Sequence, residues 1–126
     1  MKTTKLLYAI TLMVGLLSSC TYTASQLSRG GFYLCGIDYL YCTSEQTCIH
    51  ESAHRFDAQH GFISSKPEYQ VAVTAYAMTN PDGLWSKEIL NYNGSWSELY
   101  AQLYESAGGN IDLMPVELQK FYLVTK

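Results

Sequence analysis

Residues 49–57 read Ile-His-Glu-Ser-Ala-His-Arg-Phe-Asp, and this stretch restricts the possible folds more than any other part of the chain. Its two histidines, His50 and His54, are four positions apart. In an α-helix, side chains at this spacing lie above one another on the same face, so a helix here offers two imidazoles to one point in space. The rest of the fold must then place a further ligand opposite that face.

Signals at both ends support a helix around the two histidines, from about residue 44 to residue 60. Thr43 and Gln46 have the spacing of a capping box, in which two side chains satisfy free N–H groups at the start of a helix. Gly61 is expected to end the helix, because glycine readily adopts the left-handed conformation that follows a last turn. The histidines thus fall in the interior of the predicted helix.

The pattern His-Glu-x-x-His is typical of catalytic zinc sites. Such a site has three protein ligands and one position left open for water. Glu51 follows the first histidine, where its carboxylate can take a proton from that water once the metal has lowered the pKa of the water. We therefore predict one Zn²⁺ ion bound by His50 and His54, with Glu51 as general base in the hydrolysis of a peptide bond. The simpler alternative is two histidines on the surface of a helix.

Two residues are candidates for the third ligand. His60 has the spacing of the last histidine in the long metzincin motif, but Asp57 stands where that motif needs a glycine to turn the chain. If the helix continues, His60 is ten residues from His50 and too far along the axis to reach the same ion. The second candidate is Glu98, which is also at the right distance to close a capping box with Ser95.

Residues 1–19 have the features of a bacterial lipoprotein signal peptide. A short basic segment precedes an apolar run, residues 6–17, that is too short to span a bilayer comfortably. The run ends in Leu-Ser-Ser-Cys, which resembles a lipobox, and in that family the chain is cut before the cysteine, here Cys20, which then carries the lipid. Thr21, in place of aspartate, favours the periplasmic side of the outer membrane if the source is Gram-negative. The alternative is an ordinary secretory signal with a chance cysteine.

Without the signal peptide about a hundred residues remain, which suffice for one domain with a small core. We expect a flexible, lipidated tether at residues 20–30 and one folded domain at residues 31–126. The net charge of −3 is mild and reveals no basic patch, so nucleic acid is not an expected partner. The expected partners are a peptide or protein substrate and, through the lipid anchor, the membrane.

Three cysteines follow Cys20, namely Cys35, Cys42 and Cys48. An exported protein meets an oxidising compartment, so we expect one disulfide among the three, with the remaining cysteine free or paired elsewhere. We favour a bridge from Cys48 that pins the preceding segment to the predicted helix, although the sequence does not choose its partner. No CxxC pair is present, which argues against a zinc site built on cysteine.

The remaining segments predict a small α+β domain. Residues 31–42 are aromatic and β-branched around Gly36, which indicates one or two short strands. A strand beside the zinc helix would suit an extended peptide, which can pair with a free strand edge. Residues 84–93 are expected to be irregular or briefly helical. Further helices are predicted at residues 65–78, opened by a capping box of Ser65 and Glu68, at residues 95–107, and in a short stretch after Pro115.

Three segments together resemble the gluzincin metallopeptidases related to anthrax lethal factor, in particular its catalytic domain. The first is residues 50–57 followed by Gly61, and the second is residues 98–104, which read Glu-Leu-Tyr-Ala-Gln-Leu-Tyr. The third is the closing stretch, residues 108–122, with its Gly-Gly and Met-Pro pairs. The second segment departs from the pattern, because Gln102 stands where relatives often have an acid.

The resemblance implies a zincin-like fold with an active-site helix, a second metal-ligand helix and a short sheet. By position it implies His50, His54 and Glu98 as the zinc ligands and Glu51 as the general base. The metzincin-like arrangement, with His60 as third ligand, stays open as an alternative.

The resemblance also implies roles for two supporting residues. A tyrosine shortly before the ligand glutamate would donate to the oxyanion of the reaction, and Tyr92 is the nearest to that place. Asp57 would accept a hydrogen bond from a ligand histidine and so orient its ring. The rival interpretation of the whole chain is a non-catalytic envelope lipoprotein that binds zinc or a protein partner.

Overall fold

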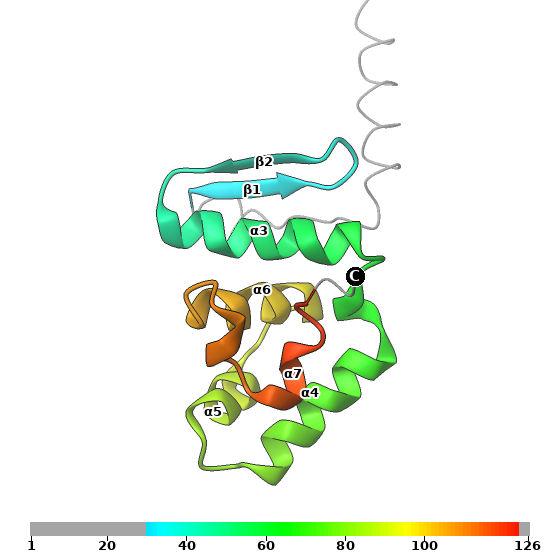
Figure 1. The fold of residues 1–126 in the computed structure, drawn as a ribbon, viewed down its shortest axis with the longest axis vertical. Helices are drawn as coiled ribbons and strands as arrows, with labels where there is room; N and C mark the ends of the chain where they lie inside the picture. Colours follow the sequence, from blue (N-terminus) through cyan, green and yellow to red (C-terminus); the bar gives the residue numbers. More distant parts are fainter. Residues whose placement is uncertain (1–29, 124–126) are drawn as a thin grey trace, which may run out of the picture.

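The structure, a computed structural model, describes residues 30–123 (Figure 1). The part of the chain that it describes is α+β, as expected, with five α-helices and a two-stranded sheet. The predicted signal peptide, Cys20 and nearly all of the predicted tether lie outside the described residues. The elements are β1 Gly31–Leu34, β2 Tyr39–Cys42, α3 Glu45–Gln59, α4 Pro67–Thr79, α5 Leu84–Asn91, α6 Trp96–Ser106 and α7 Val116–Gln119, with short 3-10 helices at Ile63–Ser65 and Ile111–Leu113.

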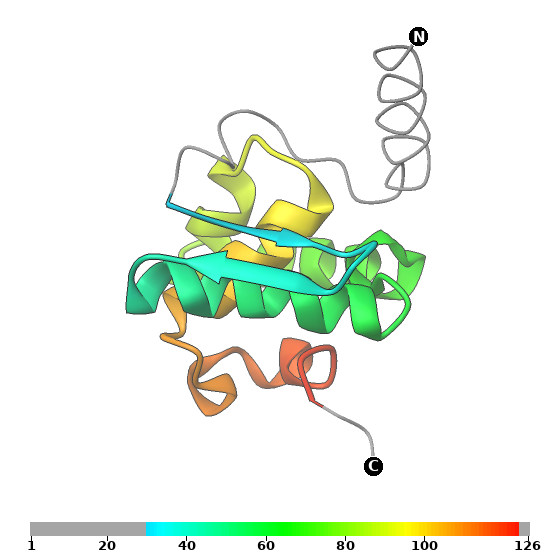
Figure 2. The ribbon, with the colours of Figure 1, turned by 90° about the horizontal axis from the view of Figure 1, so that it is seen from above.

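The elements form layers, with α3 between the hairpin and the other helices (Figure 1). The hairpin of β1 and β2 runs along one side of α3, and α6 packs against the other side (Figure 2). The strands are antiparallel, with Gly31 opposite Cys42 and Leu34 opposite Tyr39, which confirms the strands predicted in residues 31–42. The helix that carries the histidines is therefore covered on two sides.

The hairpin turn is fastened to α3 through Asp38. This residue has a left-handed φ of 49°, and its carboxylate accepts hydrogen bonds from the Tyr33 hydroxyl at 2.9 Å and from Arg55 Nε and Nη2 at 3.0 Å each. Gln59 Nε2 donates to the same carboxylate at 3.3 Å. Hydrogen bonds from Arg55 first, and then from Tyr33, hold the pKa of Asp38 below its ordinary value.

The start of α3 differs by one residue from the predicted capping box. Ser44, not Thr43, is the N-cap, and its hydroxyl accepts from the Thr47 amide at 3.2 Å. Thr43 instead donates to the Gly30 carbonyl at 2.8 Å and closes the base of the hairpin. Gln46 reaches across to α6. The end of the helix is as predicted, with Gly61 in the left-handed region at φ 75°.

A disulfide joins Cys42 at the end of β2 to Cys48 in α3. This confirms the predicted use of Cys48, and it adds a covalent link to the hydrogen bonds of Asp38 at the other end of the hairpin. No described cysteine is a free thiol. The cysteine left over is therefore Cys35, and its bonded state agrees with the second of the two predicted outcomes, pairing elsewhere instead of a free thiol.

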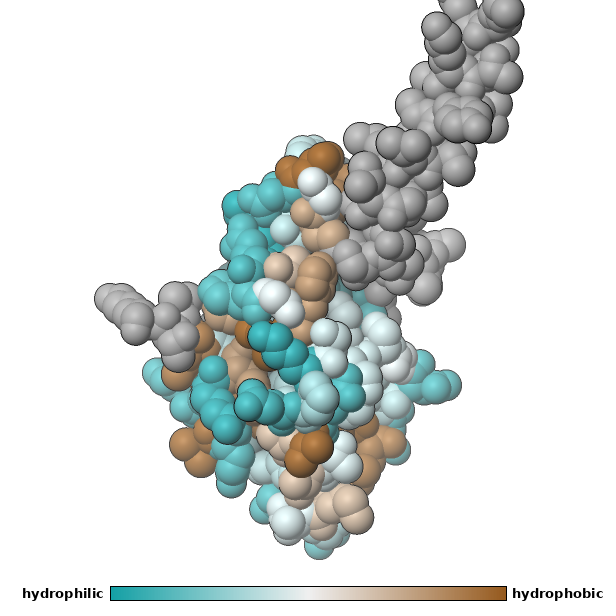
Figure 3. All heavy atoms as spheres, turned by 90° about the vertical axis from the view of Figure 1, so that its right-hand side faces the viewer, coloured by the Kyte–Doolittle hydropathy of each residue, from teal (hydrophilic) through white to brown (hydrophobic). Residues whose placement is uncertain are grey.

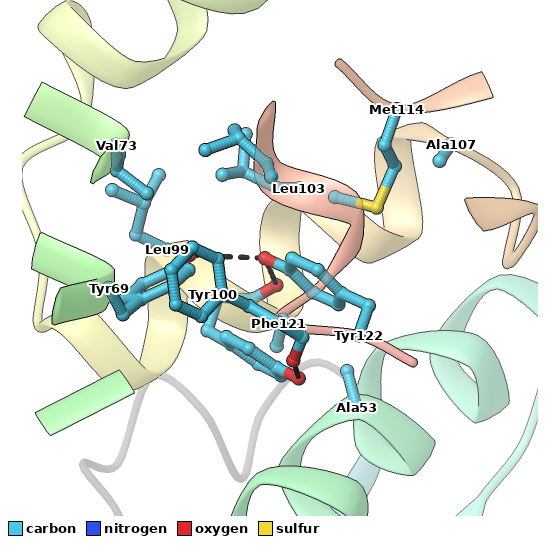
Figure 4. Close-up of a cluster of buried hydrophobic side chains, with 12 residues drawn as sticks. Ala53, Tyr69, Val73, Leu99, Tyr100, Leu103, Ala107, Met114, Phe121 and Tyr122 are labelled. Atoms are coloured by element: carbon cyan, nitrogen blue, oxygen red, sulfur yellow. Dashed lines mark hydrogen bonds between the residues drawn. The ribbon is translucent and has the colours of Figure 1, made fainter. Parts of the chain in front are cut away.

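The core contains side chains from α3, α4, α6 and α7, and three of its buried residues are the tyrosines Tyr69, Tyr100 and Tyr122 (Figure 4). Tyr122 and Tyr100 stack with ring centroids 4.2 Å apart, and Tyr69 packs against Tyr100 with its ring tilted. The Tyr122 hydroxyl donates to the Tyr100 carbonyl at 3.0 Å and lies 3.0 Å from the Tyr69 hydroxyl. The Tyr100 hydroxyl donates to the Phe121 carbonyl at 2.6 Å. Each buried phenol thus keeps a hydrogen-bond partner, as burial of a polar group requires.

The helix α4 begins without the capping box predicted from Ser65 and Glu68. Its N-cap is Lys66, which makes no side-chain capping bond, and Pro67 occupies the first turn. Ser65 ends a 3-10 helix instead, and its hydroxyl donates to the Phe62 carbonyl at 2.8 Å. The helix predicted at residues 65–78 is confirmed as α4, Pro67–Thr79. Proline suits the first turn of a helix whether or not a side chain caps it.

The described helices include none long and apolar enough to cross a bilayer. On the face drawn in Figure 3, apolar residues form several separate patches between hydrophilic ones. Single exposed apolar side chains of this kind are normal on a folded domain.

We expect the Tyr122→Phe variant to unfold more easily than the wild type by about 1–3 kcal/mol, because it leaves the buried Tyr69 hydroxyl without its partner and removes one hydrogen bond to the Tyr100 carbonyl. Urea denaturation followed by circular dichroism measures the difference. Tyr39→Phe is the control, because its ring is half exposed on the outer face of the hairpin. Equal midpoints for the two variants would show that the buried hydroxyl contributes nothing.

The stabilisation by Asp38 should depend on pH. Its pKa is lower in the folded than in the unfolded chain, so its contribution is complete above the unfolded value of about 3.9 and is lost as the pH falls towards the folded pKa. Asp38→Asn should therefore unfold more easily than the wild type at neutral pH. The difference in the free energy of unfolding between the two proteins should disappear in acid. The control is Asp82→Asn, which removes an exposed acid after α4. Urea denaturation at several pH values should give this variant and the wild type nearly the same free energy of unfolding at every pH.

Candidate metal centre

The centre lies where α3 packs against α6. The register of α6 is set by Ser95, whose hydroxyl accepts from the Glu98 amide at 3.2 Å and caps the helix. Sequence reasoning left open whether Glu98 is a capping residue or a ligand. In the structure its backbone joins the cap, and its side chain turns to the histidines of α3. The two roles use different atoms and do not compete.

The Glu98 carboxylate lies between the two imidazoles. Its Oε2 is 3.2 Å from His50 Nε2, and its Oε1 is 2.9 Å from His54 Nε2. The imidazole centroids are 5.0 Å apart. One donor atom from each residue lies within 4.8 Å of the other two, and the three residues are 5–8% exposed. His50, His54 and Glu98 thus form a buried group that could hold a metal ion.

The electrostatics of the group favour an ionised carboxylate. Burial opposes the charge on Glu98, but hydrogen bonds and charge attraction from His50 and His54 outweigh burial and lower the pKa of Glu98 well below its ordinary value. Burial likewise opposes a charged His50, yet contacts with Glu98 and Glu105 outweigh it and raise the pKa of His50. Two imidazole nitrogens and an ionised oxygen are the donor types that Zn²⁺ prefers.

Each histidine is also held at its second nitrogen. His50 Nδ1 lies 2.6 Å from Glu105 Oε2, and His54 Nδ1 lies 3.2 Å from the Ser97 hydroxyl. Sequence reasoning missed both partners. A signal for Glu105 exists in the sequence, since it follows Glu98 by seven residues, and this spacing of two turns places both acids on one face of a helix.

Asp57 makes contacts other than the predicted ones. Its carboxylate accepts from the Ser64 amide at 2.8 Å and from the Ser64 hydroxyl at 2.5 Å. Burial raises the pKa of Asp57, while the bonds from Ser64 oppose that rise. The carboxylate thus anchors the turn after α3, and the contacts at the outer ring nitrogens come from Glu105 and Ser97.

Glu51 lies beside the cluster. It is 3% exposed and borders a hollow of about 380 Å³ together with His50 and Glu105. Thr47, Gln46 and Gln102 complete the lining of this hollow. Glu51 thus lies at the wall of a polar hollow next to His50, and its role as general base stays a prediction.

Tyr92 and His60 lie elsewhere. Tyr92 ends α5, its ring covers Gly94, and it borders a different hollow with Trp96 and Leu99. Its role as donor to the oxyanion stays a prediction. His60 is exposed at the end of α3, where its Nδ1 donates to the Phe56 carbonyl at 2.7 Å and its ring stacks on Phe56. The group of candidate ligands among the described residues therefore contains Glu98 and not His60.

Comparison of the chain with protein-family models, curated proteins and solved structures finds no match.

The ligand set predicts which variants lose metal. After dialysis against Zn²⁺ and removal of the excess, the wild type should retain one zinc ion per chain by elemental analysis, while His54→Ala and Glu98→Ala should retain almost none. His60→Ala should behave as the wild type, because that ring lies outside the group. Normal binding by Glu98→Ala together with loss in His60→Ala would reverse the assignment of the third ligand.

Proposed function

We propose that the protein is a zinc-dependent peptidase with a small zincin-like fold, anchored by lipid in the cell envelope. The observation that carries the proposal is the buried group of His50, His54 and Glu98 with Glu51 beside it. The motif alone predicts two ligands, and the third comes from a helix that begins 46 residues after His50. Such convergence supports a built metal site over two unrelated histidines.

Zinc fits this group on chemical grounds. The three residues offer two nitrogens and one oxygen, and three protein ligands leave a fourth position open, as in hydrolytic zinc sites. Glu98 contacts both imidazoles, Glu105 contacts His50, and Glu51 borders the same hollow as His50. A divalent cation would balance the negative charge of these three carboxylates. When bound, zinc would polarise the scissile carbonyl and make water more acidic.

Glu51 performs the proton transfers. Its carboxylate takes a proton from water as the water oxygen forms a bond to the carbonyl carbon of the substrate. The same group then passes that proton to the departing amine as the C–N bond breaks, so Glu51 ends the cycle as it began. Its buried side chain borders the same polar hollow as His50, which supports this role.

A peptide substrate suits the hairpin. Within the described residues the sheet has two strands, so β1 and β2 each keep one edge without a strand partner. The hairpin packs along α3, and an extended peptide that pairs with such an edge would run alongside the metal helix. The lipid anchor at Cys20, which we propose from the sequence, would confine the activity to the cell that makes the protein.

Substitution of the general base tests the proposal. Glu51→Gln should bind Zn²⁺ as the wild type does, while its hydrolysis of a peptide mixture, followed by mass spectrometry, should fall by about 10²–10⁴-fold. Glu45→Gln is the control, because it removes an exposed acid from the first turn of the same helix.

Two results would contradict the proposal. If the zinc-loaded wild type cleaves no peptide in the mixture, or if Glu51→Gln cleaves as fast as the wild type, the protein is not this enzyme. Zinc binding without cleavage would favour the rival interpretation, an envelope lipoprotein that binds zinc or a partner without catalysis.

A further inference from the structure

The contact between His50 and Glu105 is the shortest one in the metal group. His50 Nδ1 is 2.6 Å from Glu105 Oε2, while His50 Nε2 faces Glu98 at 3.2 Å. A neutral imidazole has one N–H donor and one acceptor nitrogen. A carboxylate only accepts, so Glu105 would keep the one hydrogen of a neutral, metal-bound His50 on Nδ1. The lone pair of Nε2 is then directed at the metal position.

Glu105 is itself held in place. Gln46 Nε2, from the first turn of α3, donates to Glu105 Oε1 at 2.6 Å. The two oxygens of Glu105 therefore serve two different partners, both on α3, and the side chain is only 15% exposed. A chain of contacts runs from Gln46 through Glu105 to His50, and it joins the end of α6 to the start of α3.

Gln102 does not compete for this role. It lies one turn after Glu98 and borders the same hollow as His50, but its amide nitrogen lies 3.4 Å from Glu88 Oε1 and 3.5 Å from the Ser106 hydroxyl. An amide can neither supply the charge of a carboxylate nor bind an N–H donor as strongly. The acid that serves His50 therefore comes from two turns beyond Glu98.

The two histidines are held unequally. At the outer nitrogen His50 meets a carboxylate at 2.6 Å, whereas His54 meets a hydroxyl at 3.2 Å. A hydrogen bond to an ionised acceptor is about twice as strong as one between neutral groups, and it makes the ring more basic towards a metal. Removal of Glu105 should therefore disturb one of the two rings and spare the other.

We infer that Glu105 is the positioning residue of this site: it orients His50 towards the metal and fixes its tautomer, and Gln46 holds Glu105 in turn. The inference rests on the proposed zinc site. It gives Glu105 and Gln46, which lie outside the His-Glu-x-x-His motif, a role in metal binding. It also explains why Gln46, which has the spacing of a capping residue, points away from the helix start.

The test compares zinc affinity and the histidine NMR signals of the full-length protein. Glu105→Gln should weaken Zn²⁺ binding, measured by competition with a chromophoric chelator, by about ten- to a hundredfold. With ¹⁵N-labelled histidine and zinc bound, the Nδ1–H signal of His50 should move upfield, while that of His54 stays in place. A loss of structure alone would shift both signals.

Glu88→Gln is the matched control. It removes one negative charge beside α6, where Glu88 contacts Gln102 and Ser106, but Glu88 touches no histidine in the described contacts. Its zinc affinity and both histidine signals should equal those of the wild type. If Glu105→Gln does not fold, Gln46→Ala replaces it, because Gln46 is exposed and its loss frees one oxygen of Glu105. That variant should shift the His50 signal and weaken zinc binding severalfold.

The outcomes separate this inference from the proposed function. A wild type that binds no Zn²⁺ overturns both. A wild type that binds Zn²⁺, with equal affinity and an unchanged His50 signal in Glu105→Gln or its substitute, overturns only the role of Glu105. Weaker binding with a shift confined to His50 supports it.

Discussion

The fold depends on the burial of charged and titratable groups between α3 and α6. Isolated, each of these groups would cost several kcal/mol to remove from water. Two of them are tolerated because they contact complementary partners: Glu98 contacts two imidazoles, and Glu105 contacts His50 and Gln46. The interface between the two helices is thus specified by polar geometry as much as by apolar packing. A bound cation would balance the negative charge of these carboxylates, which the side chains around them balance only in part.

The other contacts of α3 keep this interface in register. Asp38 and the disulfide of Cys42 with Cys48 attach the hairpin near its two ends. Asp57 anchors the turn that follows the helix. The core fixes the inner face of α6, so that Tyr100 is buried while Glu98 faces α3. Packing on both sides of α3 holds the candidate ligands in place, as a preorganised metal site would require.

Much of this arrangement follows from local sequence patterns. The helix of the histidines, the hairpin and the ends at Gly61 and Ser95 could be predicted because each depends on residues a few positions apart. Glu98 came from a resemblance to known metallopeptidases, since no local pattern connects it to His50. The predicted capping box at Thr43 was wrong because the Thr43 hydroxyl donates to the Gly30 carbonyl instead. Gly30 is 13 residues away, so a local sequence pattern does not reveal this contact.

The partners of the histidine rings could not be predicted for the same reason. Periodicity along α6 puts Glu98 and Glu105 on one face, but it does not tell how α6 is rotated against α3. The resemblance implied Asp57 as a partner of a ligand histidine, yet the chain turns back after Gly61 and brings Ser64 to the Asp57 carboxylate. Contacts between distant segments depend on packing, which a motif does not describe.

The cap of α6 has a consequence for how such a site tolerates change. Ser95 caps α6, and Glu98 lies in the first turn of the same helix. The position of Glu98 relative to the start of the helix is therefore fixed by the cap. The connection before Ser95 can therefore lengthen or shorten over generations without disturbing the cluster. One residue inserted between Glu98 and Glu105 would instead rotate the second acid by about 100° around the helix and separate two side chains that now act together.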